Sequence, residues 1–159
     1  PTMTDFADHL TTAFPEVRLK KYLEMRGADG GPWNRLSALP AFWVGLLYDA
    51  TALAAAWDLV KDFSMAEREA LRSGVPKHAL KLPFRGGTVR DLATEALKIS
   101  AYGLKRRARL NARGMDEAMY LEPLIEFADA GICPAERKLE LFHGDWQGSV
   151  DPIFKAFAY

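Results

Sequence analysis

The stretch VRLKKYLEMR, residues 17–26, decides the fold together with the loop GADGG, residues 27–31, that follows it. Its residues alternate in character, and a period of two predicts a β-strand. One face would carry mostly polar side chains, namely Arg18, Lys20, Tyr22, Glu24 and Arg26. The opposite face would carry Val17, Leu19, Lys21, Leu23 and Met25. We therefore expect a continuous strand over residues 17–26 that ends in a glycine-rich loop.

Helical patterns cover most of the remaining chain. Ser64 and Glu67 form a capping box, which predicts a helix from Ser64 to about Gly74. Thr88 precedes the longest helical pattern. The segment AFWVGLLY, residues 41–48, is apolar on nearly all sides, so we expect it to be buried all round. Further helices are predicted over residues 5–13 with Thr4 as cap, 33–48 with a restart at Pro40, 115–130, 134–142 and 151–159.

The predicted strand has no convincing partner within the chain. Residues 80–84 are a weak candidate because Pro83 interrupts them. Since a strand by itself leaves unpaired backbone groups and is not stable, its partners are expected on a segment outside this chain or on another copy of it. The sequence therefore predicts one mainly α domain over residues 1–159, with one or few strands.

Composition excludes several classes of protein. The 159 residues contain 21 Lys and Arg and 21 Asp and Glu, so the net charge is zero, whereas a nucleic-acid binder usually carries a basic excess. One cysteine, Cys133, favours a reducing compartment. We find no signal-peptide pattern, and the longest apolar run, residues 39–48, is too short to cross a bilayer. These features predict a cytoplasmic protein without nucleic-acid or membrane partners.

Glu24 and Arg26 are the strongest candidates for chemistry. They are two residues apart, so on a strand they point the same way and lie about 7 Å apart. A carboxylate can hold a magnesium ion, and a neighbouring guanidinium can clamp a phosphate or carboxylate through two hydrogen bonds. The alternative is an ordinary charge network on a solvated strand face, which is common.

The loop after the strand suits a ligand site or a structural turn. Gly27, Gly30 and Gly31 allow close approach of the backbone, and Asp29 could cap the next helix or meet a cation. Trp33 would begin that helix, and helix N-termini favour anions. The run is not a phosphate-binding loop of the Walker type, because the required glycine spacing and lysine are absent.

Longer motifs carry a family resemblance over nearly the whole chain. The run HLTTAFPEVRLKKYLEMRGADGGPW, residues 9–33, closely resembles the matching stretch of glutamate–cysteine ligases of the plant and proteobacterial type. The similarity continues through LPAFWVGLLYD, residues 39–49, LKLPFRGG, residues 80–87, and GDWQGSVDPIF, residues 144–154, to the terminal aromatic Tyr159. Members of this family are about three times as long, and the chain resembles their C-terminal third.

The resemblance implies an activity and a division of labour. Family members use ATP and magnesium to phosphorylate the γ-carboxylate of glutamate, after which the amine of cysteine forms γ-glutamylcysteine, the first step of glutathione synthesis. It also implies the C-terminal part of a glutamine-synthetase-like α+β fold, in which an antiparallel sheet forms a funnel. Most ATP and metal ligands would come from the N-terminal part of the same enzyme, so the isolated chain is expected to be inactive.

The family pattern also implies roles for four residues of this chain. Arg26 would act on the glutamate substrate or the transferring phosphate, Glu24 would be a magnesium ligand, and Trp33 and Tyr22 would bind substrate. Partners would be glutamate, cysteine and the N-terminal part of the enzyme, or another copy of the chain.

Two other functions compete with the ligase. The chain could be a non-catalytic helical interaction module or a degenerate relative, which would bind neither ATP nor glutamate. A basic run, Lys105, Arg106, Arg107 and Arg109, could bind RNA, but a solvated helix end explains it as well. His9, His78 and His143 show no metal-ligand spacing.

Overall fold

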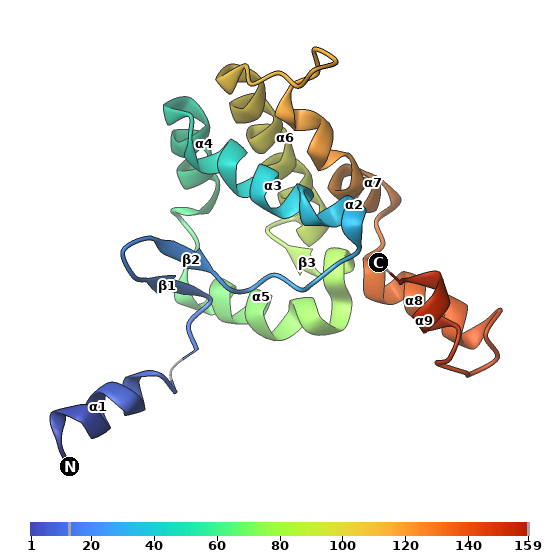
Figure 1. Cartoon of the computed structure of the whole chain (residues 1–159), viewed down its shortest axis with the longest axis horizontal. Helices are drawn as coiled ribbons and strands as arrows, with labels where there is room; N and C mark the ends of the chain where they lie inside the picture. The colour runs from blue at the N-terminus through green and yellow to red at the C-terminus, as the bar shows by residue number, and fades with distance from the viewer. Residues whose placement is uncertain (13, 159) are drawn as a thin grey trace. The chain divides into compact units, whose positions relative to one another are not determined.

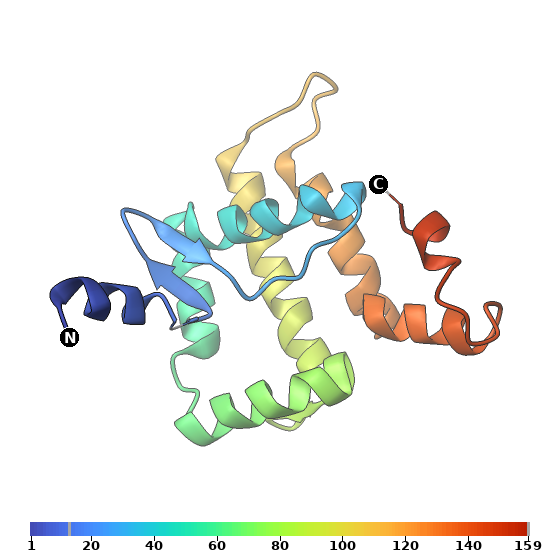
Figure 2. The same ribbon diagram turned by 60° about the horizontal axis from the view of Figure 1, so that its bottom comes forward.

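Two helices that cross at glycine residues form the centre of the larger part of the molecule. In the computed structural model, which describes residues 1–12 and 14–158, α3 (Ala38–Leu47) packs chiefly against α6 (Val89–Arg107). A Cβ on Gly45 would clash with the backbone and side chain of Ser100, and one on Gly103 would clash with the carbonyl oxygen of Gly45. Ser100 is fully buried and donates a hydrogen bond of 2.9 Å to the Phe42 carbonyl. Figures 1 and 2 both show α6 passing across α3.

The chain divides into two compact units at the glycine-rich loop, unit 1 over residues 1–30 and unit 2 over residues 31–159. Unit 1 holds α1 (Met3–Leu10) and the antiparallel pair β1 (Val17–Leu19) and β2 (Leu23–Met25). The remaining described elements of unit 2 are α2 (Trp33–Leu36), α4 (Ala50–Val60), α5 (Met65–His78), η1 (Ala79–Lys81), β3 (Pro83–Phe84), β4 (Gly87–Thr88), η2 (Glu117–Leu121), α7 (Glu122–Ala130), α8 (Pro134–His143) and α9 (Ile153–Ala156). The prediction of a mainly α fold with few strands is confirmed.

Residues 17–26 form a hairpin, so the prediction of one continuous strand is wrong. Val17 pairs with Met25, and the chain reverses between Leu19 and Leu23. The amide of Lys20 closes the turn by donating to the Tyr22 carbonyl at 2.9 Å. The partner of the first strand therefore lies within the same ten residues, and the expectation that every partner lies outside the chain is also wrong. Residues 80–84 pair elsewhere, because β3 forms its own antiparallel pair with β4.

Capping residues set most helix starts as the sequence predicts. The Ser64 and Glu67 capping box opens α5, and Thr88 precedes α6, where its amide and hydroxyl both donate to the Asp91 carboxylate. Other boundaries differ. Thr2, not Thr4, caps α1, α5 continues through Pro76 to His78, and the break before α3 falls at Ser37 instead of Pro40. The helix predicted over residues 151–159 is shorter in the structure, where α9 spans Ile153–Ala156, and Tyr159 lies outside the described residues.

A single arginine holds the β3–β4 turn to the start of α5. The Arg85 Nε and Nη2 atoms donate to the two carboxylate oxygens of Glu67, at 2.5 and 2.9 Å, and Nη2 also donates to the Asp62 carbonyl. The same guanidinium stacks on Phe63, 4.7 Å from the ring centroid. Arg85 has a φ of 47°, which residues other than glycine rarely adopt, so these contacts hold a strained turn in place.

Among residues 1–12 and 14–158, no single helix is both long and apolar enough to cross a membrane. The stretches Trp33–Leu47 and Ala50–Val60 meet the criteria of length and composition only when joined across a 93° bend.

The helix crossing predicts a large cost for a single added methyl group. Gly103→Ala should lower the free energy of unfolding of the chain by about 2 kcal/mol or more, because α6 would have to move away from the Gly45 carbonyl. Urea unfolding of Gly103→Ala, Gly45→Ala and the control Gly30→Ala measures this. A Cβ at Gly30 meets nothing within 4 Å, so that variant should stay within about 0.5 kcal/mol of the parent. Equal midpoints for all three variants would contradict the close crossing.

The Glu67 interactions predict a pH-dependent loss of stability. Hydrogen bonds from Arg85 and Ser64 lower the pKa of Glu67 from 4.5 to about 2. Because the folded-state pKa is the lower one, this stabilisation is present above about pH 4.5 and is lost as pH falls toward 2. The melting temperature of Glu67→Gln should lie below that of the parent at pH 6, and the gap should narrow by pH 2.5. A gap that stays constant over this range would show that the Arg85–Glu67 pair does not stabilise the fold.

Candidate functional site

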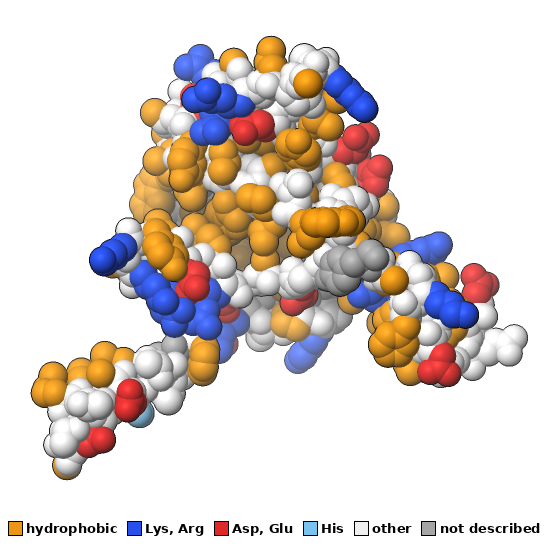
Figure 3. Space-filling model, viewed as in Figure 1, with side chains coloured by type: hydrophobic (Ala, Val, Ile, Leu, Met, Phe, Trp, Pro, Cys, Tyr) orange, Lys and Arg blue, Asp and Glu red, His pale blue; other side chains and the backbone are white. Residues whose placement is uncertain are grey.

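The β1–β2 hairpin places four charged residues on one face. Arg18 pairs directly with Glu24, and the amide of Arg26 donates to the Glu16 carbonyl at 2.9 Å, which extends the same register by two residues. Because alternate residues of a strand share a face, Glu16, Arg18, Glu24 and Arg26 lie on the same side. Figure 3 shows Lys and Arg side chains gathered over this hairpin, with acidic atoms among them.

The Glu24 carboxylate lies between two guanidinium groups. Arg18 Nε donates to Glu24 Oε2 at 2.7 Å, and Arg26 Nε lies 3.9 Å from the same oxygen. The hydrogen bond from Arg18 is the main reason that the pKa of Glu24 lies below its ordinary value, and it outweighs the opposing effect of partial burial. Glu24 is therefore an anion at neutral pH. Its hydrogen bond orients the Arg18 side chain, whereas Arg26 Nε lies beyond hydrogen-bonding distance.

Arg26 has a donor atom that no described group satisfies. Its side chain is 26% exposed, and its guanidinium lies 5.3 Å from the centroid of the Phe14 ring. Nη1 is buried and has no hydrogen-bond partner among residues 1–12 and 14–158. A buried N–H without an acceptor costs free energy, so a native arginine in this state calls for an anion or a further protein group. The geometry suits recognition of a carboxylate or phosphate.

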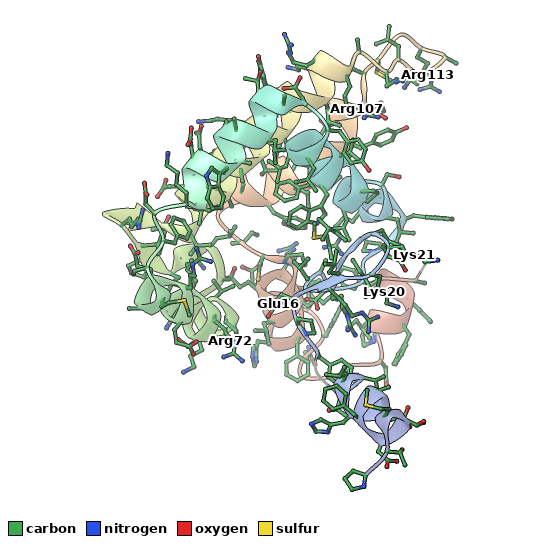
Figure 4. The ribbon with its side chains drawn as sticks, turned by 90° about the vertical axis from the view of Figure 1, so that its left-hand side faces the viewer. Glu16, Lys20, Lys21, Arg72, Arg107 and Arg113 are labelled. Carbon is green, nitrogen blue, oxygen red and sulfur yellow. The ribbon has the colours of Figure 1, made fainter. Side chains whose placement is uncertain are left out.

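Tyr22 lies in the hairpin turn and not in a strand. The turn interrupts the alternation between Leu19 and Leu23, so the pattern no longer assigns Tyr22 to the face of Glu24 and Arg26. Tyr22 is exposed, and Figure 4 shows its neighbours Lys20 and Lys21 at the tip of the hairpin. Its predicted contact with substrate stays a prediction.

Trp33 and Asp29 belong to the connection between the units. Trp33 is the first residue of α2 in unit 2 and is 75% exposed, so its side chain is available for a contact. Pro32 is the N-cap residue of α2, so Asp29 does not cap this helix. A Cβ at Gly27 would lie 2.7 Å from the end of the Glu16 side chain, so a larger residue there would only displace that exposed carboxylate.

The described residues show no cluster of side chains that marks a metal site. They contain no group of three His, Cys, Asp or Glu side chains close enough to share one. Glu24 could contribute one carboxylate oxygen to magnesium, a cation that prefers oxygen ligands in octahedral geometry. Waters, substrate oxygens or other protein groups would complete its coordination.

Sequence reasoning found Arg18, Glu24 and Arg26 on one face but missed the importance of Phe14. The alternating pattern predicts this shared face correctly although the segment is a hairpin, because the turn places Glu24 opposite Arg18. Phe14 precedes the strand and carries no pattern of its own. The sequence shows only that Phe14 stands next to Pro15, just before the strand segment.

Comparison with known proteins decides the family. The model of glutamate-cysteine ligase family 2 (GCS2) matches residues 2–156. The chain belongs to this family. It is 51% identical to the chloroplastic glutamate–cysteine ligase of Nicotiana tabacum and 53% identical to that of Arabidopsis thaliana, and in both cases all of this chain matches 29% of the relative. Ligase A of Oryza sativa subsp. indica is 54% identical, with 31% of its length covered.

Two consequences follow from the comparison. The chain spans about 30% of the length of these ligases. The activity and substrates of a whole ligase are therefore not assigned to this chain by the comparison. The prediction of a cytoplasmic protein is wrong, because the similar ligases are named chloroplastic. One cysteine favours any reducing compartment and does not distinguish the cytosol from the plastid.

The arginine pair around Glu24 predicts a measurable titration shift. In the chain labelled at glutamate side chains, the carboxyl of Glu24 should titrate below the ordinary range, and Arg18→Ala should raise its pKa, because the largest stabilising contact is lost. Carbon-detected NMR between pH 2 and 7 follows this resonance. Lys21→Ala, at the hairpin tip, is the control and should leave the titration unchanged. An unchanged midpoint in Arg18→Ala would contradict the pairing.

Proposed function

We propose that the protein of which this chain is a part is an ATP-dependent glutamate–cysteine ligase. In this proposal the chain is the C-terminal part of the enzyme and supplies a portion of the site for glutamate and the transferring phosphate. Membership of the ligase family supports the reaction, and identities of 51–54% with named ligases support the substrates glutamate and cysteine.

The unsatisfied Nη1 of Arg26 is the observation that carries the site assignment. The Arg26 guanidinium lies near Glu24 and the Phe14 ring, and its buried Nη1 has no partner among residues 1–12 and 14–158. An anionic oxygen of the substrate would satisfy that donor once the groups that cover it move aside, because the atom is buried. Preorganised donors of this kind are the main source of transition-state stabilisation in reactions that develop negative charge.

The chemistry needs charge stabilisation and no nucleophilic side chain. An oxygen of the glutamate γ-carboxylate attacks the γ-phosphorus of ATP, the bond to ADP breaks, and an acyl phosphate forms. The cysteine amine then attacks the acyl carbon, phosphate leaves, and the nitrogen loses its proton. Arg26 would neutralise charge on the carboxylate or phosphoryl oxygens in both steps. Magnesium, when bound, supplies further charge neutralisation at the phosphates.

Other residues would take supporting roles. Glu24 would be a magnesium ligand alongside groups from the N-terminal part of the enzyme, and Trp33 and Tyr22 would contact substrate. The outer edges of β1 and β2 have no strand partner among the described residues, and a two-stranded sheet is marginal by itself. Strands of the N-terminal part, or of another copy, would extend this hairpin into the antiparallel sheet of a glutamine-synthetase-like fold.

Substitution of Arg26 in the full-length enzyme tests the proposal. Arg26→Ala should lower kcat/KM by at least about 100-fold, because a donor to the developing charge is lost. Arg26→Lys should recover little of this, because an ammonium lacks the two-point geometry of guanidinium. Lys21→Ala, a cation at the hairpin tip, is the matched control and should keep the parent rate. Circular dichroism checks that each variant is folded, and normal turnover in folded Arg26→Ala would overturn the assignment.

A further inference from the structure

A mainly apolar groove lies on unit 2 along one side of α3. Its volume is about 400 Å³, and its floor is made of Leu36, Pro40, Val44 and Leu104. Leu104 is fully buried, whereas Leu36 is 44% exposed, so the groove runs from the core outward to the solvent. Its volume lies within the range of pockets that take a small ligand or a few side chains.

The other end of the groove is polar but electrically balanced. Arg107 Nε donates to Glu117 Oε2 at 3.0 Å, and both side chains are half-buried. The Arg107 guanidinium also lies 5.4 Å from the centroid of the Tyr48 ring. Tyr120 completes this end and is 40% exposed. Figure 4 shows Arg107 at the end of α6, set apart from Arg113 in the loop beyond it.

This combination favours a peptide segment over an ionic metabolite. Because Arg107 and Glu117 neutralise each other, the groove offers no surplus charge for a phosphate, a carboxylate or an ammonium group. Its apolar floor can take side chains. The Tyr120 hydroxyl and the outer atoms of the Arg107–Glu117 pair can form hydrogen bonds with backbone groups. An apolar centre with a polar rim is the ordinary composition of a protein–protein contact.

The length of the related ligases indicates where that segment comes from. About 70% of each relative lies outside the part that this chain matches. Helix α3 is apolar on nearly all sides, yet Leu39 and Pro40 are exposed among the described residues. A helix of this kind is stable in water only when all its sides are covered. Figure 3 shows hydrophobic side chains exposed over α2, α3 and α4, which is consistent with a face that is covered in the whole protein.

We propose that the groove over Leu36, Pro40 and Val44 is a docking site for an apolar segment of the same ligase molecule that lies outside residues 1–159. The proposal rests on the proposed function only in taking the whole protein to be a full-length ligase. The segment places one or two large apolar side chains on the floor and hydrogen-bonds its backbone at the Tyr120 end. Docking there fixes unit 2 against the rest of the enzyme.

Photo-crosslinking in the full-length enzyme tests the docking site. A benzophenone amino acid replaces Leu36 in one variant and Tyr120 in a second, since both side chains are partly exposed. Arg72 on α5, whose side chain is 76% exposed, is the control position. After irradiation, mass spectrometry identifies the joined peptides, and a denaturing gel separates monomer from dimer.

The expected result is intramolecular. Positions 36 and 120 should join to one continuous segment outside residues 1–159 in a product of monomer mass, with a yield at least about tenfold above that at position 72, because the dry centre of a contact holds its partner in place. A product of twice the mass would show that a second copy fills the groove and would overturn the proposal. Yields equal to that at position 72 would show an open surface and would also overturn it.

Turnover is not needed for the crosslink. Failure of the docking proposal therefore leaves the Arg26 assignment intact. Conversely, normal turnover of Arg26→Ala would overturn the site assignment but would not change which peptides are crosslinked at positions 36 and 120.

Discussion

The close crossing of α3 and α6 is the constraint on which unit 2 depends. Gly45 and Gly103 bring two helix backbones into contact, and the buried Ser100 hydroxyl joins them by a hydrogen bond to the Phe42 carbonyl. The apolar cluster of Ala41, Leu104 and Leu121 lies beside this crossing, and η2 and α7 pack onto it. Because backbone contact leaves no room for a methyl group, the crossing fixes the relative position of the two helices more tightly than side-chain packing would.

Unit 2 exposes much apolar surface around the same crossing. Helix α3 uses one side to contact α6, and α4 buries Ala52 against the pair, but Leu53 and Trp57 remain exposed. A chain of this length could bury more if it were the whole of its domain. In the proposed full-length ligase these sides would be available to the rest of the enzyme, since the chain matches about 30% of each related ligase.

Sequence patterns predicted the helices better than the strands. Capping boxes such as Ser64 with Glu67 are local hydrogen-bonding devices, so they identified helix starts without knowledge of the fold. The hairpin turn at Lys20, Lys21 and Tyr22 has no glycine, proline or asparagine, so nothing in the sequence marks the reversal. The prediction that Arg18, Glu24 and Arg26 share a face is nevertheless correct, because residues paired across the two strands lie on the same side. The orphaned donor of Arg26 depends on Phe14 and on burial, which no spacing in the sequence encodes.

An experimental structure of the full-length enzyme with glutamate and a magnesium–nucleotide complex bound is the most direct test of the proposed site. We predict that Nη1 of Arg26 donates to an oxygen of the glutamate γ-carboxylate or of the transferring phosphate, while Nε still faces Glu24. A structure in which Nη1 bonds a protein carboxylate or carbonyl, and no ligand oxygen lies within hydrogen-bonding distance of the guanidinium, would contradict the proposed site.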